Sequence, residues 1–127
     1  GIMSGKAIEA ANILNARGIS CGVVHFPTIK PLEVEMVCEI AEISDVIVTL
    51  DEHLLNNGLG TALLETLNEA GSAPLPTIKR LGIRDQFTRH YGSQDTLLEE
   101  FRLQPHQIAE DVERIARKDQ AINGRVQ

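Results

Sequence analysis

The sequence predicts a three-layer α/β/α fold, in which helices cover both faces of a mainly parallel sheet. Amphipathic helical segments alternate along the chain with short apolar runs of strand length. Aromatic residues are few, with no Trp, one Tyr and three Phe, so Ile, Val, Leu and Ala have to build the core. A length of 127 residues is that of a single domain. We therefore expect one domain over residues 1–118, followed by a frayed tail over residues 119–127.

Several segments repeat their apolar residues at the spacing of a helix. The first covers residues 4–17, where Ser4 is placed to cap the helix and Gly18 to end it. Its apolar stripe contains Ala7, Ala11 and Leu14 and is widened by Ile8. The further predicted helices are residues 32–43, a helix opened by residues 57–60 that contains Leu63, Leu64 and Leu67, a short helix after Ser93 with Leu97, Leu98 and Phe101, and a helix from Pro105 to about Lys118.

Three short apolar runs are predicted as strands, over residues 21–26, 46–50 and 77–81. The first is followed by Pro27 and Pro31, which cannot continue a central ladder. Because strands and helices alternate, the strands are expected to be parallel and joined by right-handed crossovers. The loops at their carboxyl ends would then cover residues 27–31, 51–60 and 82–92.

The charge of the chain argues against two classes of partner. Asp and Glu number 18 against 12 Lys and Arg, and the resulting net charge of −6 repels nucleic acid and anionic membranes. No apolar run is long enough to span a membrane, and no signal segment is evident. Cys21 and Cys38 lack the spacing of a zinc site or a disulfide framework. We expect a cytoplasmic protein with two buried free thiols.

The loop over residues 51–60 holds the candidate functional residues. In an open α/β sheet, ligands bind beyond the carboxyl ends of the strands. Asp51, Glu52 and His53 could supply an acid, a base or ligands, and Gly58 and Gly60 let amides at a helix start approach an anion. The alternative is structural: the glycines allow a tight turn and close packing, while the acidic pair caps the helix or lies at an interface.

Other kinds of active site find no support in the residues. The chain lacks a dinucleotide fingerprint, a phosphate loop and a nucleophile elbow. His25, His90 and His106 have no second ligand at metal spacing and are predicted to lie at the surface or an interface. We assign no catalytic, cofactor-binding or metal-binding residue, and we expect a domain that works together with another one.

Several short motifs follow one another from about residue 1 to residue 116. They are Gly1-Ile2-Met3, Thr28-Ile29-Lys30-Pro31-Leu32, Val48-Thr49-Leu50-Asp51-Glu52-His53, Asn57-Gly58-Leu59-Gly60, Arg80 to Phe87, and the closing Leu97, Leu98, Leu103 and Ile108. In this order they resemble the C-terminal domain of the transketolase family of thiamine-diphosphate enzymes. Four motifs depart from the family pattern at one position each: Glu33 follows the "KPL" turn where the family has Asp, Asp51 replaces the first Glu of "EEH", Asn57 replaces the first Gly of "GGLG", and Arg84 stands in place of Pro.

This resemblance implies an enzyme that transfers a two-carbon ketol unit between sugar phosphates. It also implies thiamine diphosphate and Mg²⁺ at a dimer interface, held by domains other than this one. The C-terminal domain would then contribute to subunit packing, so its partners are the other domains or subunits of a homodimeric parent enzyme. We expect this chain alone to bind no cofactor and to be inactive.

Three alternatives stay open at this point. The segment His90-Tyr91-Gly92-Ser93 resembles the "HGs" of 1-deoxyxylulose-5-phosphate synthase, and the pyruvate dehydrogenase β subunit shares the same domain. A free-standing α/β module that binds a small anion is the third alternative. The family also has one or two strands ahead of the Gly-Ile-Met turn, so the sheet is expected to lack at least one strand.

Overall fold

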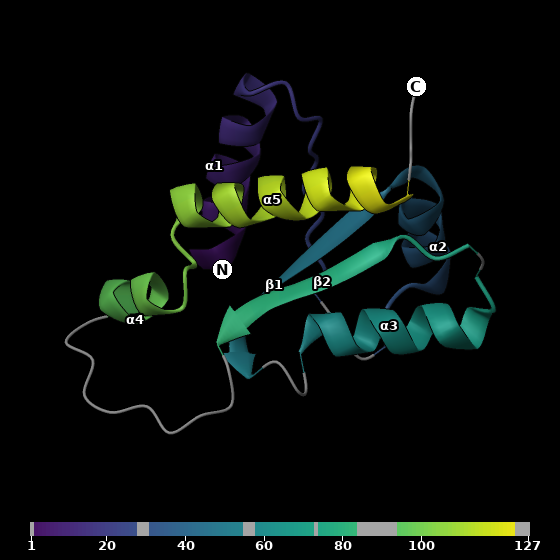
Figure 1. Ribbon diagram of the computed structural model, residues 1–127. Helices are drawn as coiled ribbons and strands as arrows, with labels where there is room; N and C mark the ends of the chain where they lie inside the picture. The colour runs from purple at the N-terminus through teal and green to yellow at the C-terminus, as the bar shows by residue number, and fades with distance from the viewer. Residues whose placement is uncertain (1, 28–30, 55–57, 73, 84–93, 124–127) are drawn as a thin grey trace.

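The computed structural model describes residues 2–27, 31–54, 58–72, 74–83 and 94–123. Helices lie on both sides of a small sheet, with α5 on one side and α3 on the other (Figure 1), which confirms the predicted α/β fold. The elements in chain order are α1 (Ile2–Ala16), α2 (Val34–Ile43), β1 (Val46–Leu54), α3 (Leu59–Ala70), β2 (Thr77–Ile83), α4 (Gln94–Glu100) and α5 (Pro105–Asn123).

The sheet consists of β1 and β2, which run parallel. Their register begins with Val46 opposite Thr77 and is regular as far as Asp51 opposite Gly82. The next pair is Leu54 with Ile83, so the two residues of β1 between the pairs have no counterpart and form a β-bulge. Two of the three predicted strands are confirmed, those over residues 46–50 and 77–81, and each is longer than the apolar run that indicated it.

The predicted strand over residues 21–26 is wrong for the structure described here. This segment has no regular secondary structure, and Val23 and Val24 are 41% and 49% exposed. β-Branched residues favour an extended backbone, but a strand also needs a neighbour with which to exchange hydrogen bonds. Among the described residues β1 and β2 pair only with each other, so this segment exchanges no ladder hydrogen bonds with either strand.

One apolar cluster lies between the sheet, α1, α4 and α5. Its buried side chains come mainly from the helices, and Leu50 of β1 and Leu81 of β2 pack against them. Ala109 is fully buried, which lets α5 approach its neighbours closely. The buried members are Met3, Ala10, Leu14, Leu98, Leu103, Ile108 and Ala109. The predicted stripe of the first helix is confirmed at Ala11 and Leu14, whereas Ile8 is 52% exposed and does not widen it.

A second apolar cluster holds α2 and α3 against the same strands. Ile47 of β1 and Ile78 of β2 pack against it, on alternate positions from Leu50 and Leu81. The two strands therefore separate two cores, as expected for a sheet covered on both faces. The buried members are Leu32, Val37, Ala41, Ala62, Leu63 and Leu67. In α3 the predicted stripe is confirmed at Leu63 and Leu67, while Leu64 is 39% exposed.

The predicted C-terminal end of the first helix is confirmed, but its predicted N-terminal cap is wrong. Gly18 adopts a left-handed conformation with φ 82°, and the Ile19 N–H donates to Leu14 O at 3.0 Å, which closes the helix as predicted. Ser4 is not the cap, because α1 begins at Ile2. The Ser4 hydroxyl instead lies 3.2 Å from Nδ1 of the exposed His25.

The last helix starts at Pro105, as predicted, but it runs on to Asn123. The segment 119–123, which was expected to begin a frayed tail, is therefore helical, and residues 124–127 lie outside the described part of the chain. Asp119 is only 5% exposed and accepts a hydrogen bond from the Thr77 hydroxyl at the start of β2. This contact ties the end of α5 to the sheet.

Charged contacts hold α5 against α4 and α1. Arg102 follows α4 with φ 59°, a left-handed conformation that costs a non-glycine residue about 1–2 kcal/mol. Its guanidinium forms ion pairs with Asp111 at 3.2 Å and with Glu110 at 2.9 Å. Hydrogen bonds to these two carboxylates raise the pKa of Arg102, and Asp111 has the larger effect. Glu113 accepts bonds from Arg117 and Arg17, which lower its pKa. The ion pair between Arg17 and Glu113 joins α1 to α5.

The second cluster predicts a clear contrast between two leucines of α3. Leu67→Ala should lower the free energy of unfolding by about 2–5 kcal/mol, because Leu67 is fully buried and its loss leaves a cavity. Leu64→Ala, on the exposed side of the same helix, should cost under about 1 kcal/mol. Urea unfolding of both variants of this chain measures the difference. Equal losses would contradict the packing described for α3.

Candidate functional site

Asp51 lies near the carboxyl end of β1 and turns inward. The residue is 7% exposed and stands two positions after Thr49, so both side chains are on the same face of the strand. One carboxylate oxygen, Asp51 Oδ1, accepts a hydrogen bond from the Leu59 N–H at 2.9 Å. Leu59 is the first residue of α3, and its amide has no acceptor inside the helix. Asp51 therefore caps α3 from the neighbouring strand, a contact that the structural alternative for this residue expected.

Gly58 is needed because the Asp51 carboxylate lies directly against it. A Cβ atom at Gly58 would stand 2.5 Å from Asp51 Cγ, a distance that real Cβ atoms do not adopt. The backbone of Gly58 is extended, so its conformation would suit any residue, and only the contact excludes a side chain. The absence of a side chain at Gly58 thus allows close packing, as the structural alternative expected, and the group that packs against its backbone is a carboxylate of the protein itself.

Gly60 is enclosed by two side chains of the sheet. A Cβ atom there would overlap the Cγ and Cδ atoms of Arg80 and would lie 2.7 Å from Thr49 Oγ1. Arg80 crosses from β2 over the start of α3, where its Nη1 donates to Thr61 Oγ1 at 3.2 Å. The start of α3 is thus packed against both strands. Side chains of the strands fill the space beside Gly58 and Gly60.

Two buried oxygens face this contact without a hydrogen-bond partner in the described part of the chain. They are Thr49 Oγ1 and Asp51 Oδ2. Buried polar atoms without partners are uncommon and cost about 1–3 kcal/mol each. The hydrogen bond between Asp51 and the Leu59 amide therefore stabilises the contact between β1 and α3, whereas the burial of Thr49 Oγ1 and Asp51 Oδ2 destabilises it.

The other members of the predicted loop are placed differently from the expectation. Asp51, Glu52 and His53 belong to β1 rather than to a loop, because pairing with β2 continues past the apolar run as far as Leu54. Glu52 and His53 form the bulge of β1, and their side chains lie outside what the structure describes. Most of the third loop, residues 84–92 with His90, also lies outside the described residues, as does Ser93.

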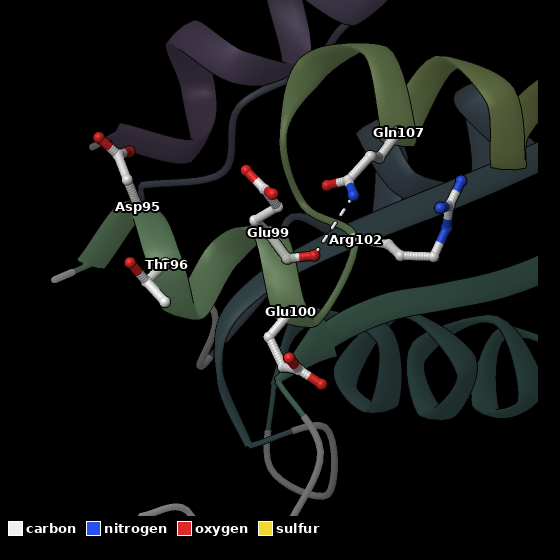
Figure 2. A pocket seen from close by; sticks show the side chains of 6 residues that line it. All are labelled: Asp95, Thr96, Glu99, Glu100, Arg102 and Gln107. Carbon is white, nitrogen blue, oxygen red and sulfur yellow. Dashed lines mark hydrogen bonds between the residues drawn. The ribbon is translucent and has the colours of Figure 1, made fainter. Parts of the chain in front are cut away.

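A separate open hollow lies beside α4 and the start of α5 (Figure 2). Its lining includes three carboxylates, from Asp95, Glu99 and Glu100, together with Arg102. Figure 2 shows Asp95 and Arg102 on opposite sides of the hollow, and Gln107 bonding the backbone oxygen of Glu99 at 3.3 Å. These polar groups do not converge on one point, so the hollow lacks the arrangement expected of a catalytic site.

Residues with metal-binding or nucleophilic chemistry are dispersed over the described structure. His25 lies in the irregular segment after α1 and His106 in the first turn of α5, and both are exposed, as predicted. Cys21 and Cys38 are both free and half-buried, and burial raises the pKa of the Cys21 thiol. Within the described ranges, no three His, Cys, Asp or Glu side chains lie together as a metal site would need. None of the helices in this part of the chain has the length and apolar character to cross a membrane.

Sequence reasoning missed the parts of the site that come from packing between distant segments. Thr49, Thr61 and Arg80 were not candidates, although the structure brings them to the glycines of the loop. The alternation of side chains along a strand could have placed Thr49 on the same face as Asp51. The contact of Arg80 with Gly60 had no signal in the sequence, since it depends on the register of β2 against β1.

Comparison with known proteins gives consistent relatives. The chain is 39% identical over 118 residues to 1-deoxy-D-xylulose-5-phosphate synthase of Heliobacterium modesticaldum. The aligned residues cover 93% of this chain and 17% of that protein. It is 40% identical over 106 residues to the synthase of the same name from Exiguobacterium sibiricum, covering 84% of this chain and 16% of the relative. The chain thus spans less than a fifth of the length of these curated relatives.

A solved structure has a similar fold. It is described as a split gene transketolase, inactive beta4 tetramer, and it superimposes with a TM-score of 0.78 and 35% sequence identity over 90% of this chain and 36% of that chain. The family model for the C-terminal domain of transketolase matches residues 1–108. This match covers most of the described helices and both strands. The chain therefore belongs to the transketolase C-terminal domain family.

Proposed function

We propose that this chain is a non-catalytic assembly domain of a larger thiamine-diphosphate enzyme. The observation that carries the proposal is the position of Asp51. A carboxylate at the carboxyl end of a strand is well placed for chemistry, but here it is buried and bonded to the Leu59 amide. An anion at the start of α3 would compete with this carboxylate for the same amide. We infer that Asp51, Gly58 and Gly60 serve packing rather than anion binding or catalysis.

The edge of β1 that faces away from β2 supports a role in assembly. β1 pairs with β2 along one edge, and the described residues provide no strand for its other edge. An unpaired edge exposes backbone donors and acceptors that favour pairing with another strand. The segment after α1 contributes Cys21 to the first cluster and Phe26 to the second, so it passes from one face of the sheet to the other.

We infer that a strand from the rest of the parent enzyme pairs with this edge of β1. The curated relatives are several times longer than the chain, so a parent protein of that size has ample further sequence to supply a strand. The half-exposed Val23 and Val24 would then be covered by the same strand. Other domains or subunits of the parent enzyme, including those of a homodimer, are the partners that this proposal implies.

The described residues do not fit thiamine diphosphate and its metal ion. The hollow beside α4 presents three carboxylates, whose charge opposes a diphosphate, and only one guanidinium. At the start of α3, Asp51 and Arg80 already occupy the space over the glycines. We therefore propose that other domains of the parent enzyme hold the cofactor and Mg²⁺.

For the reaction of the parent enzyme, the curated relatives favour synthesis of 1-deoxy-D-xylulose 5-phosphate. Both relatives described above carry that name at 39% and 40% identity. Transfer of a two-carbon ketol unit between sugar phosphates is the second candidate, because the similar solved structure is described as a transketolase. The two reactions form different products, so an assay of the parent enzyme separates them.

We predict that the isolated chain does not bind the cofactor. Calorimetric titration of residues 1–127 with thiamine diphosphate and Mg²⁺ should give no heat of binding, because the described polar groups do not converge on a site of the required charge. The full parent enzyme serves as the positive control. Micromolar binding by the isolated chain would contradict the assembly proposal.

We predict that Asp51 stabilises the domain and does not take part in the reaction. Asp51→Ala leaves the Leu59 amide without its acceptor, and it should lower the free energy of unfolding by about 1–3 kcal/mol. Asp51→Asn is the matched control, because it keeps an oxygen acceptor and removes only the charge beside the helix, worth about 0.3–1 kcal/mol. Urea unfolding of this chain measures both losses.

The same two variants, placed in the assembled parent enzyme, distinguish structure from catalysis. Single-turnover rates of correctly assembled Asp51→Ala and Asp51→Asn enzymes should stay within a few-fold of the unmodified enzyme. Loss of a true acid or base costs on the order of 10² to 10⁴ in rate. A loss of that size in Asp51→Asn with normal assembly would show that this domain takes part in the chemistry.

We predict that the parent enzyme forms 1-deoxy-D-xylulose 5-phosphate from pyruvate and a triose phosphate. Pyruvate loses its carboxyl group as CO₂ and leaves a two-carbon unit, which becomes the methyl ketone end of the five-carbon product. This unit forms a carbon–carbon bond with the aldehyde carbon of the triose phosphate, and the aldehyde oxygen takes up a proton. Mass spectrometry identifies the product that the parent enzyme forms from pyruvate and a triose phosphate. A second assay supplies a pair of sugar phosphates in place of these substrates. Turnover of the sugar phosphates alone would favour the transketolase candidate instead.

A further inference from the structure

We draw no further inference here: the strongest candidate, the buried oxygens Thr49 Oγ1 and Asp51 Oδ2 beside the N-terminus of α3, belongs to the site already described, and the side chains of Asp51 and Arg80 fill the space over Gly58 and Gly60 that a ligand would need.

Discussion

The parallel pairing of β1 with β2 positions both apolar clusters and the start of α3. It sets Leu50 and Leu81 toward one apolar cluster and Ile47 and Ile78 toward the other, so a single register serves both faces. Because side chains alternate along a strand, a slip by one residue would exchange the two faces. The same pairing carries Arg80 to the first turn of α3, while Asp51 caps that helix from β1.

The contact between β1 and α3 explains why polar residues at the edge of the sheet need not form an active site. Gly58 and Gly60 let the start of α3 lie very close to the two strands. Asp51 occupies the space that a side chain at position 58 would need, and Arg80 occupies the space at position 60. The gain is a helix whose first amide is bonded to a carboxylate, which suits the positive end of the helix dipole. The cost is the burial of Thr49 Oγ1 and Asp51 Oδ2 without partners among the described residues.

Most helices and two strands could be predicted from periodicity, because burial of one helical stripe or one strand face leaves a local pattern. Such a pattern does not report pairing, which is why residues 21–26 were expected to form a strand and Asp51 a loop. The sequence allowed two interpretations of Asp51, and its hydrogen bond with the Leu59 N–H is a contact that only the three-dimensional structure reveals. Contacts of Arg80 and Thr49 with Gly60 join segments distant in sequence and could not be foreseen.

We propose that the edge of β1 that pairs with no described strand forms an interface with the rest of a larger enzyme. Along a parallel strand, successive residues direct their amides alternately to the two neighbours, so half of the amides of residues 46–51 point away from β2. Residue-resolved hydrogen exchange of the isolated chain and of the full parent enzyme tests this directly. These amides should exchange quickly in the isolated chain and slowly in the parent enzyme, while the amides bonded to β2 should be protected in both. Equal exchange of the outward amides in the two proteins would contradict it.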